Sequence, residues 1–263
     1  MNKHIIVTGS SRGIGYELVK ILAEQGHRIY ALSRNQQPIA QLNLKNVHSL
    51  SCDLSDESSI EKTIDFIKSQ SEYIDVLVNN AGHFLNQAFE DTNIADVKAV
   101  YETNIFGVFT LTSKLIKTFS KINHTVNISS MGGIQGSVKF PGLAAYSSSK
   151  AALICLTELL AEEYKESDMA FNCLALGAVQ TEMLEEAFEG PDVEALVIRT
   201  LPNNNKQGKD YSNTNPPYLT EDAMKWVVEK NFTHLLIDLP SVDREFDDGK
   251  LAAHHSFWNY PDR

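Results

Sequence analysis

Short apolar runs alternate along the chain with longer amphipathic segments. The runs at 4–8, 28–33, 47–52, 74–78, 125–129 and 169–176 are mostly β-branched or aliphatic and predict six strands. The segments at 13–25, 57–69, 95–119 and 147–164 have the spacing of helices, and Asp53, Ser55 or Asp56 is placed to cap the second of them. Strands that are apolar throughout and alternate with helices indicate a parallel sheet covered on both faces. The predicted class is therefore α/β, with a doubly wound sheet.

The pattern changes near residue 190. Six of the eight prolines and both tryptophans lie in 191–263, and 201–217 is a polar stretch that predicts a long loop. Strands at 195–200 and 234–239 and a helix at 220–230 are predicted around that loop. We therefore divide the chain into residues 1–190 and an atypical C-terminal segment, 191–263.

Composition restricts the partners. The 263 residues carry a net charge of −11, which argues against nucleic acid or an anionic membrane as the main partner. No apolar stretch reaches the roughly 18 residues that span a bilayer, and no signal peptide is recognised, so the cytoplasm is predicted. Three cysteines, an odd number, lie in or near apolar runs without metal spacing, which favours buried reduced thiols.

A glycine-rich turn follows the first strand and precedes the first helix. Such a turn lets the backbone approach a pyrophosphate, and the free N–H groups of the helix N-terminus bind the phosphates. This setting predicts a dinucleotide-binding sheet of the Rossmann type, and a plain connecting turn is the alternative reading. The residues expected to contribute are Thr8, Gly9, Ser11, Arg12, Gly13, Ile14 and Gly15.

The end of the second strand predicts which cofactor binds. An acidic residue there usually binds a free ribose 2′-hydroxyl, but no Asp or Glu occurs between Gly26 and Cys52. Arg34 stands at this strand end instead and can pair with a 2′-phosphate, with help from Arg12. NADP is therefore favoured over NAD, and a solvated surface arginine is the alternative reading of Arg34.

Tyr146 and Lys150 lie one helical turn apart and share a face. The same spacing at Tyr16 and Lys20 shows that this pair alone is not specific. An ammonium about 4 Å from a phenolate favours the ionised form by about three pKa units at an effective dielectric of 20, which predicts a lowered pKa for Tyr146. Tyr146 then becomes a usable acid/base, and Ser130 can hydrogen-bond the reacting oxygen. Ser147, Ser148 and Ser149 are read as first-turn residues of a helix.

These motifs, taken in order, resemble the classical short-chain dehydrogenase/reductase family over about residues 3–189. The resemblance implies hydride transfer between NADP(H) and a small carbonyl or alcohol, with Asn104, Ser130, Tyr146 and Lys150 as the catalytic residues. It implies that Asn104 anchors a water that links Lys150 to solvent, and that Tyr146 and Lys150 also contact the cofactor. Further cofactor contacts are implied at Asp53, Leu54, Asn80, Ala81 and Gly82, and Asn79 supports the sheet.

Three departures from that family stand out. After the sixth strand, Gly177, Val179 and Thr181 match the cofactor-binding segment, but the usual proline is missing. The connection between Ser130 and Tyr146 is about three residues longer than usual, around Ser137–Lys139, which predicts a longer loop. Nothing after Pro191 resembles the usual substrate helices and seventh strand.

Residues 194–263 instead resemble part of the metal-dependent cyclase/arylformamidase-like hydrolases, especially at 195–200, 238–243 and 253–255. The resemblance implies that His254 can be a metal ligand, but one ligand does not make a site, so no metal is predicted. The strand–helix–strand at 195–239 is a candidate replacement for the seventh strand. Alternative functions are a cofactor-binding but catalytically impaired fusion protein and a fragment of a metal-dependent hydrolase. The dehydrogenase resemblance implies a dimer or tetramer, whose usual interface a lost seventh strand would weaken.

Overall fold

The computed structural model describes residues 2–119, 122–177, 181, 195–198, 218–229, 234–237, 253 and 255–256. The chain divides into two compact units. The first comprises residues 1–175 and 180–189, and the second comprises residues 176–179 and 190–263.

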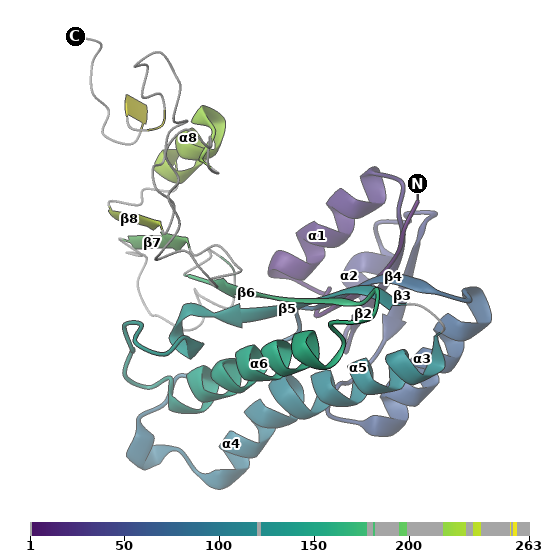
Figure 1. Cartoon of the computed structure of the whole chain (residues 1–263), viewed down its shortest axis with the longest axis horizontal. Helices are drawn as coiled ribbons and strands as arrows, with labels where there is room; N and C mark the ends of the chain where they lie inside the picture. The colour runs from purple at the N-terminus through teal and green to yellow at the C-terminus, as the bar shows by residue number, and fades with distance from the viewer. Residues whose placement is uncertain are drawn as a thin grey trace. The chain divides into compact units, whose positions relative to one another are not determined.

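A six-stranded sheet forms the centre of the first unit (Figure 1). Its strand order is β3-β2-β1-β4-β5-β6, and the pairings β1–β2, β1–β4, β2–β3 and β4–β5 are all parallel. The order reverses between β1 and β4, which makes their carboxyl ends the expected place for a ligand. The strands are β1 (His4–Thr8), β2 (Arg28–Ser33), β3 (Val47–Ser51), β4 (Ile74–Asn79), β5 (Ile122–Ser130) and β6 (Ala170–Leu176).

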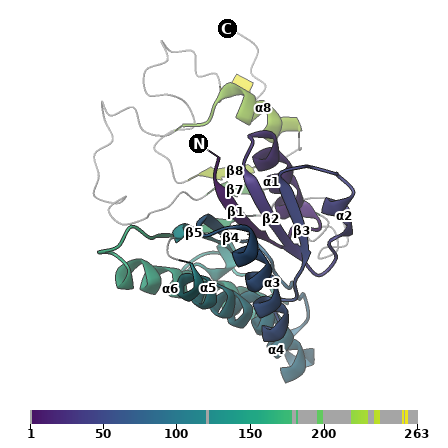
Figure 2. The same ribbon diagram turned by 90° about the vertical axis from the view of Figure 1, so that its right-hand side faces the viewer.

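Helices cover both faces of this sheet, as Figure 1 and Figure 2 show. Successive residues of β1 point to opposite faces, so Ile5 and Val7 pack with Val19 of α1, whereas Ile6 packs with Leu111 of α5. Both faces of the strand are therefore buried, which confirms the doubly wound α/β class. The helices are α1 (Gly13–Glu24), α2 (Gln37–Ala40), α3 (Glu57–Gln70), α4 (Ile94–Tyr101), α5 (Gly107–Thr118) and α6 (Ala144–Glu163).

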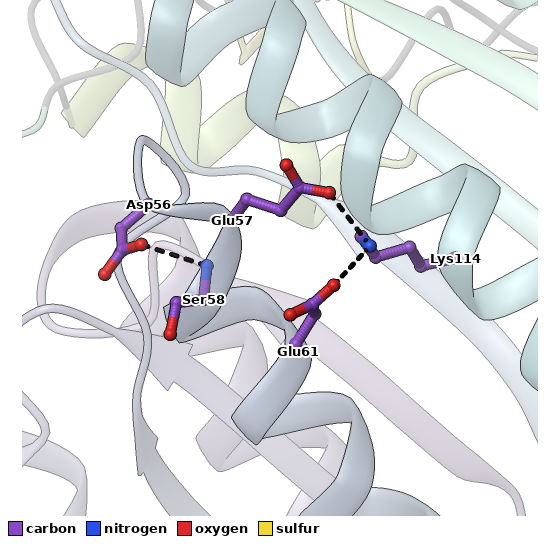
Figure 3. A network of polar contacts seen from close by, with 5 residues as sticks. All are labelled: Asp56, Glu57, Ser58, Glu61 and Lys114. Carbon is purple, nitrogen blue, oxygen red and sulfur yellow. Dashed lines mark hydrogen bonds and ion pairs between the residues drawn. The ribbon is translucent and has the colours of Figure 1, made fainter.

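Polar contacts fix where α3 starts and how it meets α5 (Figure 3). Asp56 accepts a hydrogen bond from the Ser58 N–H at 2.9 Å and is the N-cap, one of the three candidates expected. Lys114 of α5 pairs with Glu57 at 2.9 Å and with Glu61 at 2.7 Å. Both glutamates are exposed, so these ion pairs contribute little to the stability of the fold.

The long helix predicted over 95–119 is interrupted. A π-helical turn, η2 (Glu102–Phe106), separates α4 from α5. Apolar spacing could not predict it, because a single wide turn leaves the periodicity on both sides almost intact. The four-residue α2, with Pro38 in its first turn, was also not predicted, and α6 begins at Ala144 rather than Ser147.

The second unit contains β7 (Ala195–Ile198), α8 (Glu221–Glu229) and β8 (His234–Ile237), which confirms the predicted strand–helix–strand with shorter elements. β7 and β8 pair in parallel in a two-stranded sheet of their own. Among the described residues, this segment therefore does not supply the seventh strand for which it was a candidate. The loop predicted at 201–217 lies outside the described residues.

The three cysteines differ in burial. Cys52 and Cys173 are buried thiols as predicted, but Cys155 is exposed on α6, because its helix position turns it away from the sheet. None of the helices in the described part of the chain is long and apolar enough to cross a membrane.

Gly107, at the start of α5, provides a test of how closely this helix packs on Leu54. A Cβ added there would overlap the Leu54 carbonyl oxygen and lie 2.7 Å from the Leu54 Cβ. Gly107→Ala is therefore expected to lower the free energy of unfolding by about 1–3 kcal/mol, although alanine favours helix. Urea denaturation measures it, with the exposed Lys117→Ala on the same helix as the control. Equal or greater stability of Gly107→Ala would contradict the close packing.

Candidate active site

The glycine turn after β1 is shaped by close contacts. Gly9 and Gly13 have positive φ angles of 68° and 56°, in the left-handed region that favours glycine. A Cβ on Gly9 would lie 2.6 Å from the Ala81 Cα, and one on Gly15 would overlap the Gly9 carbonyl oxygen. Gly15 thus allows the helix to pack on its own turn. The N-cap of α1, Arg12, makes no side-chain cap hydrogen bond. The N-terminus of such a helix is a favourable place for a phosphate group.

Asn80 and Thr8 join this turn to the end of β4. The Asn80 Nδ2 donates to the carbonyls of Thr8 at 3.0 Å and Gly9 at 3.1 Å. In return, the Thr8 Oγ1 accepts from the N–H groups of Asn80 and Ala81, each at 3.0 Å. The Thr8 hydroxyl is therefore committed to the interior, and a contact between Thr8 and a cofactor stays a prediction.

The ends of β2 and β3 carry the residues expected at the adenosine. Arg34 is exposed and its carbonyl accepts from Ser51, while Leu54 is buried. Burial acts to raise the pKa of Asp53, but hydrogen bonds from the Ser55 N–H and hydroxyl and the charge of Arg34 outweigh it and lower that pKa. Asp53 is thus an anion within the electrostatic reach of Arg34. Ser11 and Ile14 are half-buried, and Arg12 is exposed, at the start of α1.

Tyr146 and Lys150 lie on α6 as predicted, but their electrostatics differ from expectation. The Lys150 Nζ is 5.6 Å from the centre of the Tyr146 ring and donates to the Ile128 carbonyl at 2.8 Å. Burial raises the pKa of Tyr146 to about 12, and burial lowers the pKa of Lys150 to about 8. The prediction of a lowered pKa for Tyr146 was wrong, because burial of the phenol dominates and the Lys150 ammonium donates to a backbone carbonyl instead.

Asn104 lies in the π-helical turn η2 and is fully buried. Its Oδ1 accepts from the His83 N–H at 2.7 Å, and its Nδ2 donates to the His83 carbonyl at 3.1 Å and to Ser149 at 2.9 Å. A Cβ on Gly82 would lie 3.5 Å from the Lys150 Nζ and 3.7 Å from the Asn104 Oδ1. Asn104, Lys150 and Tyr146 therefore gather beside the segment that follows β4.

The two serines at the end of β5 have different surroundings. Ser129 is buried and donates to the Lys150 carbonyl at 2.8 Å, which ties the strand to α6. Ser130 is half-buried, and its Oγ accepts from the Gly132 N–H at 3.3 Å. Of the two hydroxyls, that of Ser130 is the more accessible, which agrees with its selection from the sequence.

Sequence reasoning missed two residues of this site. Ser149, read as an ordinary first-turn serine, is buried and accepts from Asn104 while donating to the Tyr146 carbonyl at 2.7 Å. Phe84 packs on Tyr146 with ring centres 4.8 Å apart. The apolar character of Phe84, two residues beyond Gly82, was the one available signal.

The segment after β6 is described only in part. Gly177 directly follows β6, and Thr181 is half-buried. Val179 and His254 lie outside the described residues. Within the described part of the chain, no three or more His, Cys, Asp or Glu side chains form a group that could hold a metal ion.

Comparison with known proteins identifies the family. A family model described as short chain dehydrogenase matches residues 3–192. The chain belongs to the short-chain dehydrogenase family. It is an oxidoreductase of the hydride-transfer type that acts on a small molecule. A second model, described as putative cyclase, matches residues 159–244. The cyclase-like segment is thereby found, but it starts earlier than the predicted residue 194 and ends before 263.

Individual relatives agree with this assignment. Carbonyl reductase family member 4 of Danio rerio is 34% identical over 207 residues, which are 77% of this chain and 84% of that protein. A 4-hydroxyisoleucine dehydrogenase mutant complexed with NADH and succinate has a TM-score of 0.66 at 28% identity, over 72% of this chain and 78% of that one. The RhlG/NADP active-site complex of Pseudomonas aeruginosa has a TM-score of 0.65 at 27% identity, over 72% and 77%.

Thr8 provides a test of the link between the turn and β4. Thr8→Val removes the acceptor of two N–H groups and should lower the free energy of unfolding by about 1–3 kcal/mol. Thr8→Ser keeps the hydroxyl and should retain most of the stability. Urea denaturation of the two variants compares them directly. Equal stability of both variants would show that the hydroxyl does not hold the turn.

Proposed function

We propose that the chain is an NADP(H)-dependent reductase of a small carbonyl compound that uses Tyr146 as the proton donor. The observation that carries this proposal is the gathering of Tyr146, Lys150 and Asn104 beside Gly82. Tyr146 and Lys150 come from α6, Asn104 from η2 and Gly82 from the segment that follows β4, so the fold brings together residues far apart in sequence.

The chain fits a dinucleotide. Gly9, Gly13 and Gly15 form a turn that added side chains would fill or strain, next to a helix N-terminus without a side-chain cap. The phosphates are proposed to bind there, the adenosine near Asp53 and Leu54, and its 2′-phosphate at Arg34. Asn80, Ala81 and Gly82 are proposed to border the nicotinamide end, and Gly177, Val179 and Thr181 to contact its amide. When bound, the reduced cofactor supplies a hydride.

The side chains of the protein donate and relay the proton. With a pKa of about 12, the Tyr146 phenol is protonated at neutral pH and can donate to a carbonyl oxygen that gains negative charge. Ser130 is proposed to hydrogen-bond the same oxygen. Lys150 binds the ribose and, with Asn104, connects Tyr146 to solvent. At neutral pH the phenol is thus in the protonated form that a proton donor requires.

The proposed function is tested by binding and turnover. NADPH should raise the melting temperature of the 263-residue chain more than NADH does, and NADPH should be oxidised with members of a ketone and aldehyde panel. Binding without turnover on any carbonyl would favour the alternative, a cofactor-binding but catalytically impaired protein. No shift with either cofactor would overturn the proposal.

Arg34 is expected to select NADPH. Arg34→Ala should weaken NADPH binding by about 2 kcal/mol, or roughly thirtyfold, because a charge-assisted contact to the 2′-phosphate is lost. NADH binding should stay within about twofold, and Arg34→Lys should recover part of the NADPH affinity. Fluorescence titration of the wild type and both variants with each cofactor gives the six dissociation constants. Equal losses for both cofactors would show that Arg34 does not read the 2′-phosphate.

NADPH binding should also depend on pH through Lys150. Its pKa of about 8 means that the ammonium is present below that pH and lost above it. The dissociation constant should therefore rise above pH 8, by up to about tenfold per pH unit, between pH 7 and 9.5. Lys150→Arg keeps its charge throughout this range. The affinity of Lys150→Arg for NADPH should therefore not change with pH. If this variant shows the same pH dependence as the wild type, the titrating group is not Lys150.

A further inference from the structure

The consecutive residues Gly82, His83 and Phe84 each lie beside one residue of the proposed proton path. Those residues are Lys150, Asn104 and Tyr146. Gly82 lies beside the Lys150 ammonium, and Asn104 holds both the N–H and the carbonyl of His83. Phe84 then packs on Tyr146. Because the two bonds from Asn104 fix the backbone immediately before it, Phe84 has a defined starting position beside the tyrosine.

The Phe84 ring lies against the reactive ring in a favourable geometry. The ring centres are 4.8 Å apart and the planes are inclined by 55°, within the range preferred by aromatic pairs. Both side chains are half-buried, so part of this aromatic surface is open. Phe89, on the same connection between β4 and α4, is 78% exposed and shows that the burial of Phe84 is specific to its position.

The longer loop predicted around Ser137–Lys139 is held in place by its own polar groups. The Lys139 Nζ donates to the carbonyls of Gly132 at 2.6 Å and Ile134 at 2.7 Å and to the Ser137 hydroxyl at 3.1 Å. These three contacts use all three donors of an ammonium, so Lys139 fixes the loop instead of offering a site for an anionic substrate.

The same loop is joined to the Phe84 segment. The Gln87 N–H donates to the Gly142 carbonyl at 2.9 Å. Gly142 has a φ of 82°, and a Cβ there would overlap the Asn86 Oδ1. The connection after β4 and the connection before α6 therefore meet a few residues before Tyr146, and both are fixed relative to it.

We propose that Phe84 is a specificity-determining residue and that the substrate is an uncharged carbonyl compound with a planar aryl substituent. The inference rests on the proposed function, since it concerns the carbonyl that Tyr146 protonates. Such a carbonyl must place its oxygen within hydrogen-bond reach of the phenol, which brings its substituent close to the Phe84 ring. A planar ring can stack on Phe84 or meet it edge to face, whereas a saturated ring of similar size gains no such contact.

The experiment compares acetophenone with cyclohexyl methyl ketone, which differ in the planarity of one ring. Their dissociation constants are measured by NMR titration of the full chain saturated with NADP⁺. The variant is Phe84→Leu, which keeps an apolar side chain but removes the ring. The matched control is Phe89→Leu, on the same segment. The wild type should bind acetophenone roughly 5- to 10-fold more tightly, Phe84→Leu should bring the ratio near one, and Phe89→Leu should keep it.

Each other outcome is decisive. A ratio near one in the wild type, a ratio unchanged in Phe84→Leu, or binding of neither ketone by a chain that binds NADP⁺ would overturn the inference and leave the cofactor assignment intact. The wild-type ratio decides alone if Phe84→Leu does not fold. A chain that does not bind NADP⁺ contradicts the proposed function itself, which is a distinct result.

Discussion

The close approach of the Gly9 turn to Asn80 is the constraint on which the rest of the site depends. The Asn80 amide bonds both carbonyls at the end of β1, and the absence of side chains at Gly9 and Gly15 makes this approach sterically possible. This contact fixes the N-terminus of α1 relative to β4. It also fixes the exit of β4, from which the chain continues directly past Lys150, Asn104 and Tyr146. One junction between two strands thus positions both the proposed phosphate site and the proposed proton path.

Burial determines the proton chemistry that the chain provides. Lys150 is 3% exposed and has a backbone carbonyl as its hydrogen-bond acceptor, so desolvation is only partly compensated and its pKa falls to about 8. The same desolvation moves Tyr146 in the opposite direction, because its charged form is the anion. At neutral pH, the phenol is protonated and the lysine is mostly charged. Two groups one helical turn apart therefore have the protonation states of a donor and its supporting cation.

The sequence predicted the sheet well and the polar interior of the site less well. β1 and β2 have the predicted bounds, because each is a short apolar run ended by polar or glycine residues. The π-helical turn at Asn104 and the burial of Ser149 were not predictable in this way. Both depend on hydrogen bonds between segments 21 and 45 residues apart, which no local pattern records. The raised pKa of Tyr146 was missed for a related reason, since spacing on a helix indicates which side chains are neighbours but not how deeply they are buried.

The proposed site residues are distributed unevenly between the two family matches. Asn104, Ser130, Tyr146 and Lys150 all precede residue 159, where the cyclase match begins, and so lie where the dehydrogenase match alone applies. Gly177, Val179 and Thr181 lie in the stretch that both models match. The contacts of the proposed proton path join α6, η2 and the segment that follows β4, all of which belong to the first unit. The residues proposed to donate and relay the proton thus all belong to the first unit, whereas those proposed to contact the nicotinamide amide are divided, with Gly177 and Val179 in the second unit and Thr181 in the first.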